Sequence, residues 1–428
     1  MKIYIYTLGC KVNQYESQVM AEQMKAAGHT ICEEAADADC IIINSCTVTA
    51  ESDRKTRQAV RRFRKLRPEA VIMLAGCMPQ AFPEEAYALE AADVITGNRD
   101  HGKMPEYLAR FVENREPIRE VSPHSRQEEY TTPSLSDFSD RTRAFMKIED
   151  GCDRYCTYCT IPKARGPIRS RPLEEITAEA EALAQKGFKE IVLVGINLTS
   201  YGRETGLTIC DAVRAAAKPR GIMRVRLGSL EPDHISDATL EGLYSEEKFC
   251  PQFHLALQSG CDATLKRMNR HYDTAFYRDL VTRIRAKFKD CSITTDIMVG
   301  FPGESEEEFG ESLAFYKEIG FARGHVFAYS RRAGTVAAAL PGQLCTREKE
   351  ARAALMAAAA AECEAAFLAA QAGKDATVLF ETVKDGIYYG YTPNYSRVAV
   401  PSDTSIEGKI LPVRLLASCG DFCKGILI

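Results

Sequence analysis

Three closely spaced cysteines near the middle of the chain restrict its fold more than any other feature. Cys152, Cys156 and Cys159 have C-x3-C-x2-C spacing, so one short loop carries three thiols, and the next cysteine, Cys210, lies far downstream. Three thiolates on a four-iron cluster leave one iron without a protein ligand, and an open metal position favours chemistry over a structural role. The alternative is a zinc knuckle, but zinc usually takes a fourth nearby His or Cys, which this segment lacks. The spacing therefore favours an iron–sulfur cluster.

The same spacing is the signature of the radical S-adenosylmethionine enzymes, and this loop resembles theirs, with Tyr158 as the aromatic residue before the third cysteine. The resemblance implies a [4Fe-4S] cluster on Cys152, Cys156 and Cys159 whose open iron binds the amino and carboxylate groups of S-adenosylmethionine. It also implies that an electron from the cluster cleaves the sulfonium and releases a 5′-deoxyadenosyl radical.

Length and composition predict a cytoplasmic protein of two or three domains. The chain has 428 residues, 45% of them hydrophobic, and a net charge of −4, so any contact with nucleic acid must come from local patches. It opens MKIYIYTLGC, which lacks the apolar core of a signal peptide, and it has no apolar run long enough to span a membrane. In the cytosol, sixteen cysteines are expected to be reduced thiols and metal ligands.

The first part of the chain alternates apolar strands and helices. Residues 3–8, 40–44, 71–75 and 93–95 are typical of buried strands in a parallel sheet. The first three strands run directly into Cys10, Cys46 and Cys77. Ligands bind beyond the carboxyl ends of such strands, so we expect these cysteines to converge on one rim as a second metal site. Chance burial of ordinary thiols is the alternative, and we interpret the remaining ten cysteines in that way.

The phrases TLGCKVNQYES, NSCTVT and AGCMPQ are similar to the amino-terminal domain of the methylthiotransferases. The resemblance implies that Cys10, Cys46 and Cys77 hold an auxiliary [4Fe-4S] cluster that handles the inserted sulfur. The Lys-Val-Asn-Gln run after Cys10 most resembles the branch that acts on N6-threonylcarbamoyladenosine in tRNA.

The later parts of the chain predict two further domains. Strands are expected at 145–148, 190–194, 224–227, 253–257, 293–298 and 325–329, with helices between them, one of them from Ser305 to Gly320. An alanine-rich helix over 347–372 precedes four short strands that predict a small β-barrel and resemble the TRAM domain, an RNA-binding barrel. The expected fold is thus α/β and multidomain: a parallel α/β domain (1–120), a linker (121–140), a partial (β/α)6 radical S-adenosylmethionine barrel with a spacer helix (141–372), and a TRAM-like β-barrel (373–428).

Turns after consecutive barrel strands are predicted to bind the cofactor. Such a turn alone is more often ordinary loop chemistry, but together the turns favour a cofactor site, to which we assign Tyr158, Gly195, Asn197, Glu231, Gln258 and Ser259. Residues 327–335 depart from the family, which usually has prolines there, so the rigidity of that loop is not assured by its sequence.

Basic residues cluster at 54–65, and as a helix this segment would turn Val60, Phe63 and Leu66 inward. The opposite face would carry Arg54, Arg57, Arg61 and Lys65, either as a solvated surface or as a track for RNA phosphates, for which Arg57, Arg61 and Lys65 are the proposed contacts. In the terminal barrel, four tyrosines offer faces for stacking on unpaired bases: Tyr388, Tyr389, Tyr391 and Tyr395.

The resemblance implies an enzyme that inserts a methylthio group at C2 of N6-threonylcarbamoyladenosine at position 37, in the anticodon loop of tRNA. One S-adenosylmethionine supplies the methyl group and a second the radical that removes the C2 hydrogen, so we expect no acid–base catalytic residues. The expected electron donor is of the flavodoxin or ferredoxin type, and the sequence does not identify the sulfur donor. Alternatives are a methylthiotransferase for isopentenyladenosine in tRNA or for an aspartate of a ribosomal protein, and a non-catalytic iron–sulfur RNA-binding protein.

Overall fold

The computed structural model describes residues 1–125, 128–135 and 142–428, and their contacts divide the chain into two compact units. The N-terminal unit combines the beginning of the chain with Lys147–Arg171 and Ser330–Ala338. The barrel unit holds Pro172–Tyr329 and Ala339–Ile428 together with the strand residues before Lys147. Within the predicted linker, residues 126–127 and 136–140 lie outside the described residues. The predicted domain boundaries stay a prediction, because segments that pack together need not form one domain.

A six-stranded sheet forms the centre of the N-terminal unit. Its order is β2-β1-β3-β4-β5-β6, and every neighbouring pair is parallel. The strands are β1 (Lys2–Thr7), β2 (Thr30–Ile31), β3 (Cys40–Ser45), β4 (Val71–Gly76), β5 (Val94–Thr96) and β6 (Ile118–Glu120). β3 and β4 are buried along their whole length, as continuous apolar runs in a parallel sheet should be. The predicted strands at 3–8, 40–44, 71–75 and 93–95 are therefore confirmed.

Helices cover both faces of this sheet. Ile42 and Met73 pack with α1 (Lys11–Ala26) and α5 (Met104–Asn114), whereas Ile43 and Leu74 pack with α2 (Ala50–Leu66) and α4 (Pro83–Tyr87). Successive residues of a strand point to opposite faces, so one apolar run supplies two cores. The unit also contains η1 (Ala35–Asp37), α3 (Cys77–Ala81), η2 (His101–Lys103), α6 (Ile161–Arg165) and the antiparallel pair of β8 (Glu149–Asp150) and β9 (Arg169–Ser170).

The barrel unit contains two sheets. One has the order β11-β10-β7, with β7 (Arg143–Lys147), β10 (Glu190–Val194) and β11 (Arg224–Leu227); the other has the order β12-β13-β14-β15, with β12 (Ser229–Leu230), β13 (Gln252–Leu255), β14 (Ser292–Val299) and β15 (Arg323–Ala328). All six predicted strands are present. The structure adds the two-residue strand β12. It also divides the strands of the expected barrel into two sheets, which the positions of apolar runs in the sequence do not indicate.

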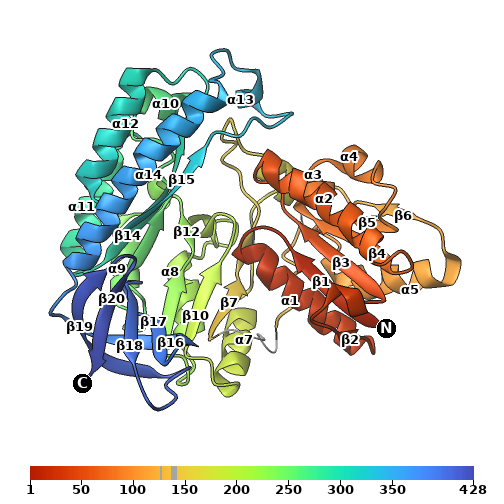
Figure 1. Cartoon of the computed structure of the whole chain (residues 1–428), viewed down its shortest axis with the longest axis horizontal. Helices are drawn as coiled ribbons and strands as arrows, with labels where there is room; N and C mark the ends of the chain where they lie inside the picture. The colour runs from red at the N-terminus through yellow and green to blue at the C-terminus, as the bar shows by residue number, and fades with distance from the viewer. Residues whose placement is uncertain (126–127, 136–141) are drawn as a thin grey trace. The chain divides into compact units, whose positions relative to one another are not determined.

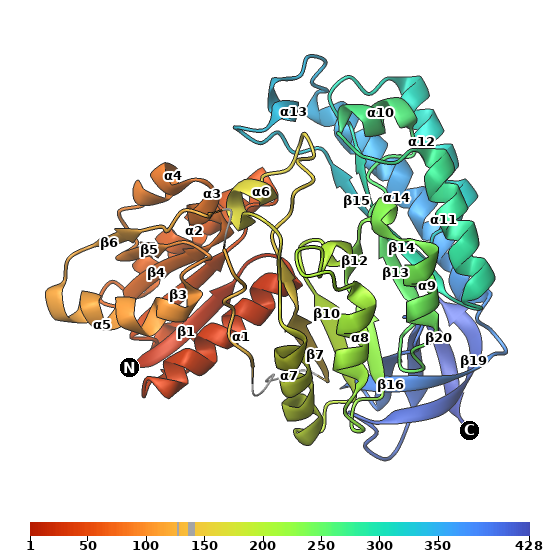
Figure 2. The ribbon, with the colours of Figure 1, turned by 180° about the vertical axis from the view of Figure 1, so that it is seen from behind.

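Helices follow the strands of the barrel unit as predicted. They are α7 (Leu173–Gln185), α8 (Ile209–Ala217), α9 (Asp237–Tyr244), α10 (Asp262–Arg267), α11 (Thr274–Lys287) and α12 (Glu306–Ile319), with the short η3 (Leu198–Ser200) and η4 (Pro232–His234). A reciprocal capping box between Ser305 and Glu308 begins α12, and Gly320 with φ +63° ends it. The alanine-rich helix α14 (Thr346–Ala369) runs beside α12 along the four-stranded sheet, after the single turn α13 (Val336–Ala339) (Figures 1 and 2).

A closed five-stranded barrel follows α14. Its strand order is β16-β17-β18-β20-β19, formed by β16 (Asp375–Lys384), β17 (Ile387–Tyr391), β18 (Arg397–Pro401), β19 (Ile410–Cys419) and β20 (Phe422–Leu427). Val378, Phe380, Val398, Val413 and Leu415 fill its core. The predicted barrel is confirmed, although the sequence reading missed β20. No helix among the described residues combines the length and the apolar character needed to cross a bilayer.

Buried arginines attach this small barrel to the three-stranded sheet. Arg224 donates to the main-chain carbonyls of Tyr391 at 2.9 Å and Thr377 at 2.7 Å. Arg226 donates to the carbonyl of Pro393 at 2.8 Å and to the Glu190 carboxylate at 2.8 Å. Since Arg224, Arg226 and Glu190 are all buried, the small barrel is an integral part of the barrel unit rather than a tethered module.

Candidate metal centre

Three cysteines of the N-terminal unit lie at the carboxyl ends of adjacent parallel strands. Cys10 follows β1 as the N-cap of α1, Cys46 follows β3, and Cys77 is the first residue of α3 after β4. Burial raises the pKa of the Cys77 thiol to about 12; Arg165 opposes this rise, and the charges of Cys46 and Cys10 add to it. The structure thus brings together the cysteines that the sequence assigned to one rim. Their role as cluster ligands stays a prediction.

Glycines and asparagines shape this rim. Gly76 has φ +98°, and a Cβ there would lie 2.5 Å from the Ser45 carbonyl oxygen, so the turn into Cys77 requires glycine. The amide Nδ2 of Asn13 donates to the Ser45 carbonyl at 3.0 Å, and Nδ2 of Asn44 donates to the Asn13 carbonyl at 2.9 Å. Asn13 and Asn44 therefore join α1 to the end of β3. Sequence reasoning missed the role of both residues, and the available signal was the polar Asn44 near the end of the otherwise apolar strand β3.

The C-x3-C-x2-C loop begins at another obligatory glycine. Gly151 has φ +90°, and a Cβ on it would lie 1.8 Å from the Pro167 carbonyl oxygen. The Cys152 N–H donates to the Gly166 carbonyl at 3.1 Å, and the Cys159 N–H donates to the Cys156 carbonyl at 3.0 Å. Burial raises the pKa of the Cys152 thiol to about 12, and the neighbouring Cys159 and Cys156 contribute. These contacts hold the three thiols in one compact turn, which also contains the half-buried Tyr158.

The surroundings of both cysteine sets fit iron–sulfur clusters. Backbone N–H groups donate to cysteine sulfur, from Val48 to Cys46 at 3.5 Å and from Ile161 to Cys159 at 3.4 Å, as is usual around cluster thiolates. In residues 1–125, 128–135 and 142–428, no three His, Cys, Asp or Glu side chains are arranged to hold a single metal ion. A four-iron cluster makes a different demand, because its three thiolates bind three separate iron atoms.

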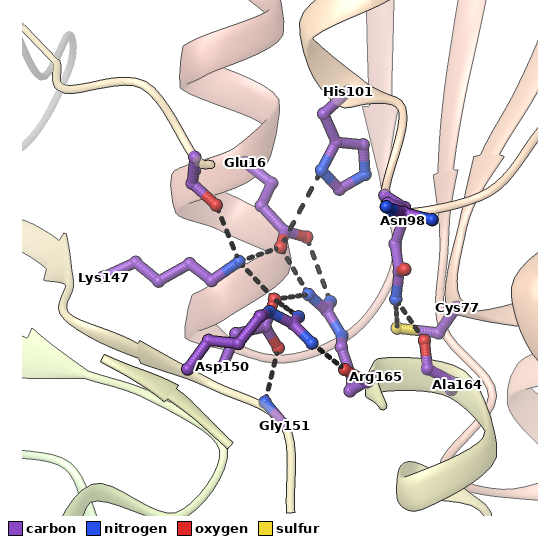
Figure 3. A network of polar contacts seen from close by, with 12 residues as sticks. Glu16, Cys77, Asn98, His101, Lys147, Asp150, Gly151, Ala164 and Arg165 are labelled. Atoms are coloured by element: carbon purple, nitrogen blue, oxygen red, sulfur yellow. Dashed lines mark hydrogen bonds and ion pairs between the residues drawn. The ribbon is translucent and has the colours of Figure 1, made fainter. Parts of the chain in front are cut away.

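A buried ionic network links the elements that carry the two cysteine sets (Figure 3). Glu16 of α1 accepts from Lys147 at 2.7 Å and from both terminal nitrogens of Arg165, with Nη2 at 3.0 Å. Lys147 also lies 2.6 Å from Asp150, whose other oxygen accepts from the Gly151 N–H at 2.9 Å. Burial alone would disfavour a charged Glu16, but Arg165 and Lys147 hold its pKa at about 2. Glu16 thus ties α1, which begins at Cys10, to the segment that enters the C-x3-C-x2-C loop.

The segment that departs from the family also holds a buried ion pair. Arg332 lies 2.6 Å from Asp53, and its Nη2 donates to the Thr47 hydroxyl at 2.6 Å. The Thr47 hydroxyl in turn donates to Asp53 at 2.9 Å. The Ala337 N–H of the same segment donates to the Thr157 carbonyl in the C-x3-C-x2-C loop at 2.8 Å. The ion pair with Asp53 and the hydrogen bond to Thr157 therefore anchor this segment.

The predicted cofactor residues of the barrel unit lie at strand ends. Gly195 and Asn197 follow β10, Glu231 follows β12, and Gln258 and Ser259 follow β13. Gln258 has φ +67°, and its main chain bridges Asp296 and Met298 of β14 with hydrogen bonds of 2.9 and 2.8 Å. Their contact with a cofactor stays a prediction.

Glu231 has a partner that the sequence reading missed. Its carboxylate lies 2.7 Å from Arg270, and both side chains are nearly buried. Arg270 also donates to the Ala256 carbonyl at 3.1 Å, so its position is fixed by the end of β13. The pair fixes the orientation of the Glu231 carboxylate, which suits a group that accepts hydrogen bonds.

The basic helix α2 agrees with its prediction except at its end. Val60 and Phe63 are buried, but Leu66, the last residue of α2, is 49% exposed, so the inward assignment of Leu66 was wrong. Arg57 lies 3.8 Å from Glu85. Arg61 and Lys65 are exposed and, in the part of the chain that the structure describes, make no ion pair.

The predicted stacking tyrosines divide into three kinds. Tyr388 lies in the barrel core, so its assignment to base stacking was wrong. Tyr391 and Tyr395 stack on each other with ring centroids 4.5 Å apart, and Arg143 lies over both rings at 5.1 and 5.2 Å. Tyr389 is half-buried at the surface, and Arg397 lies over its ring at 4.9 Å.

Two family descriptions match successive parts of the chain. Residues 2–97 match the family described as "Uncharacterized protein family UPF0004", and residues 146–316 match the "Radical SAM superfamily". In the solved structure of the radical S-adenosylmethionine methyltransferase TsrM from Kitasatospora setae, 77% of that chain superimposes on 79% of this one with a TM-score of 0.59 at 12% identity. At that identity the likeness shows the fold alone.

Curated relatives cover nearly the whole chain. The threonylcarbamoyladenosine tRNA methylthiotransferase MtaB of Bacillus subtilis is 36% identical, over 99% of this chain and 95% of its own. The protein of the same name from Thermotoga maritima is also 36% identical, over 92% of this chain and 90% of its own. The tRNA-2-methylthio-N(6)-dimethylallyladenosine synthase of Symbiobacterium thermophilum is 33% identical, over 97% of this chain and 92% of its own.

Proposed function

We propose that this chain, which belongs to the radical S-adenosylmethionine methylthiotransferase family, inserts a methylthio group at C2 of N6-threonylcarbamoyladenosine at position 37 of tRNA. The observation that carries the proposal is the full-length identity of 36% to relatives with that named activity. The two cysteine sets within one compact unit support it, because the reaction needs both a radical source and a sulfur carrier.

The proposed ligands follow from the two cysteine sets. Cys152, Cys156 and Cys159 would hold the [4Fe-4S] cluster that binds S-adenosylmethionine, and Cys10, Cys46 and Cys77 the auxiliary [4Fe-4S] cluster. When bound, these groups supply the reducing electron, the radical and the sulfur chemistry. Tyr158, Gly195, Asn197, Glu231, Gln258 and Ser259 are the proposed contacts of S-adenosylmethionine.

The side chains of the protein itself hold the cysteine-bearing segments in position. Glu16, Lys147, Asp150 and Arg165 fix the helix after Cys10 relative to the entry of the C-x3-C-x2-C loop, and Arg332 and Asp53 fix the segment after Cys46. These charges are buried and paired, so they hold the loops in place. An aryl C–H bond is inert to acid–base catalysis, so the reaction requires order and exclusion of water rather than a general base.

The proposed substrate is presented by the anticodon loop of tRNA, and the protein would act in the cytoplasm. A base in a single-stranded loop can be turned out without opening a duplex. Because the net charge is −4, phosphate contacts must be local, and Arg57, Arg61 and Lys65 on α2 are the proposed track. A flavodoxin-type or ferredoxin-type protein is the proposed electron donor.

Isopentenyladenosine is the competing substrate, because the relative from Symbiobacterium thermophilum is 33% identical over nearly as much of the chain. The test is anaerobic reconstitution of the protein with iron and sulfide, followed by reaction with two tRNAs, one bearing each modified adenosine. Mass spectrometry of the digested nucleosides should find the methylthio product from threonylcarbamoyladenosine. Product from the isopentenyl substrate alone would overturn the assignment, and 5′-deoxyadenosine without either product would exclude both tRNA substrates.

A further inference from the structure

Arg165 is fully buried, yet one of its donors has no acceptor. Nη1 and Nη2 bind the Glu16 carboxylate, and Nη1 also lies 3.4 Å from Asp150. Its Nε is buried and, among the described residues, has no hydrogen-bond partner. A buried charged group with an unsatisfied donor is costly, so native proteins rarely retain one without a further partner.

Cys77 lies close to Arg165 and is the candidate for this partner. Arg165 ends α6, and the preceding residue, Ala164, packs directly against Cys77. Burial lowers the pKa of Arg165, but Cys77 exerts the largest opposing influence, ahead of Glu16 and Asp150. Figure 3 draws the guanidinium of Arg165 between the Glu16 carboxylate and the Cys77 thiol.

The local charges are balanced, so the feature of Arg165 that is available to sulfur is its unsatisfied Nε–H. Lys147, Arg165 and Arg169 face the buried carboxylates Glu16 and Asp150, and Arg169 also lies 3.6 Å from the buried side chain of Glu128, so three cations meet three carboxylates. His101 does not change this sum, because burial lowers its pKa to about 4 and keeps it neutral at pH 7. Three thiolates on a four-iron cluster carry net negative charge, and Arg165 is the cation that lies beside one of them.

We infer that Arg165 donates its Nε–H to sulfur at the Cys77 corner of the auxiliary cluster, and that Glu16 positions it for this contact. The inference rests on the proposed function, because it assumes a cluster on Cys10, Cys46 and Cys77. A positive charge and an N–H···S hydrogen bond stabilise the more negative, reduced state, so Arg165 raises the reduction potential of this cluster.

The test measures the auxiliary cluster alone in the full chain. A variant with Cys152, Cys156 and Cys159 replaced by alanine retains only the Cys10, Cys46 and Cys77 site. Its midpoint potential is measured by redox titration followed by electron paramagnetic resonance, with and without Arg165→Gln. At a fixed applied potential, the substitution should lower the ratio of reduced to oxidised cluster at least tenfold, which is a shift of about 59 mV for one electron.

Two further variants separate a direct contact from a general effect of the network. Arg165→Lys keeps the charge but loses Nε, and should shift the potential part of the way. Arg169→Gln removes another buried cation, one that binds Asp150 at 3.2 Å, and should leave the potential unchanged. An unchanged potential in Arg165→Gln, or an equal shift in Arg169→Gln, would overturn the inference.

One further measurement keeps Arg165 in place, so it does not depend on whether the Arg165 variants fold. With arginine labelled by 15N, the reduced auxiliary cluster should show hyperfine coupling to one arginine nitrogen, and absence of this coupling would overturn the contact. Activity of the unaltered enzyme on tRNA is measured in parallel. A wild-type chain that binds only one cluster contradicts the proposed function, whereas a second cluster that is insensitive to Arg165 contradicts only this inference.

Discussion

The hydroxyl of Thr160 donates a 3.1 Å hydrogen bond to the main-chain carbonyl of Thr47. Thr160 directly follows Cys159 and Thr47 directly follows Cys46, so this bond joins the two cysteine-bearing segments at adjoining residues. Both residues are buried, and the Thr47 hydroxyl is held in turn by Arg332 and Asp53. The spacing between the proposed clusters is therefore set within one compact unit of the protein.

The first prediction concerns this connection. Arg332→Gln leaves Asp53 buried without its cation, which should destabilise the protein by about 3–5 kcal/mol and loosen the Cys46 segment. We expect more 5′-deoxyadenosine per methylthiolated nucleoside than in the wild type, measured by chromatography of both products. The control is Arg331→Gln, because Arg331 is exposed and, among the residues that the structure describes, bonds within its own segment, to the Ala338 carbonyl.

Combining Arg332→Gln with Asp53→Asn removes the unpaired charge and should restore much of the stability. If the double variant also regains the wild-type ratio of products, the ion pair contributes stability and does not control the spacing.

The second prediction is that the two clusters bind independently. Alanine at Cys152, Cys156 and Cys159 should leave one four-iron cluster, and alanine at Cys10, Cys46 and Cys77 should leave the other, because the thiols form two separate sets. Iron analysis and electron paramagnetic resonance of the reconstituted proteins measure this. Loss of all iron from either variant, with an unchanged circular dichroism spectrum, would contradict independent sites.

The third prediction separates two functions. Cys46→Ala should abolish methylthiolation and preserve reductive cleavage of S-adenosylmethionine, since radical formation requires the C-x3-C-x2-C loop alone. The measurement is 5′-deoxyadenosine and modified nucleoside from the same reaction. A variant that has lost both products while its Cys152 cluster is spectroscopically intact would refute this division.

The fourth prediction concerns RNA. Charge reversal of Arg61 and Lys65, which are exposed and have no acidic partner in the described structure, should weaken tRNA binding. Each lost phosphate contact should lower the slope of log affinity against log salt by about one unit. Lys25→Glu on α1, which packs against the opposite face of the sheet, is the matched control. Unchanged affinity and slope would make the α2 face an ordinary solvated surface.

The fifth prediction concerns pH. Burial opposes ionisation of Glu190, but its arginine partners, Arg226 foremost, lower its pKa below the ordinary value of 4.5. A depressed pKa stabilises the fold above the unfolded-state pKa, and this stabilisation is lost as the pH falls through the folded-state pKa. Glu190→Gln should therefore lower stability at pH 7 by about 3–5 kcal/mol and remove part of its acid dependence, measured by denaturant unfolding. An unaltered pH dependence would show that Glu190 does not contribute.

Removal of the small barrel is a less informative experiment than these substitutions. A chain that ends at Gly373 would leave Arg224 and Arg226 without their carbonyl acceptors on Thr377, Tyr391 and Pro393. Loss of tRNA binding by such a protein would report damage to the barrel unit as much as loss of an RNA contact. Substitution of Tyr389, a half-buried aromatic residue at the barrel surface, tests stacking on bases without this damage.

The sequence predicted most elements because local signals decide them. Apolar runs place β3 and β4, and Ser305, Glu308 and Gly320 mark the ends of α12 by capping alone. The cysteine spacings are likewise local, and they led to both thiol sets.

Tertiary packing decides what the sequence reading missed. β20 is short and finds its place only when the barrel closes between β18 and β19. Tyr391 and Tyr395 resemble exposed stacking residues until Arg143 covers them. The roles of Asn13, Arg165 and Arg332 depend on partners distant in the chain, which periodicity and spacing do not indicate.

The arginines that fasten the small barrel bind mainly its peptide carbonyls, and the Thr377 hydroxyl is the one barrel side chain among these hydrogen-bond acceptors. Every amino acid carries the same carbonyl group, so the carbonyl contacts place almost no demand on which residues the strands bear. The outward residues of the barrel can therefore be substituted, singly or by grafting from a relative, while the attachment of the barrel to the sheet is preserved. A chimaera that exchanges only these outward residues should fold as this chain does. Its activity on different tRNAs would show whether these residues determine the specificity for tRNA.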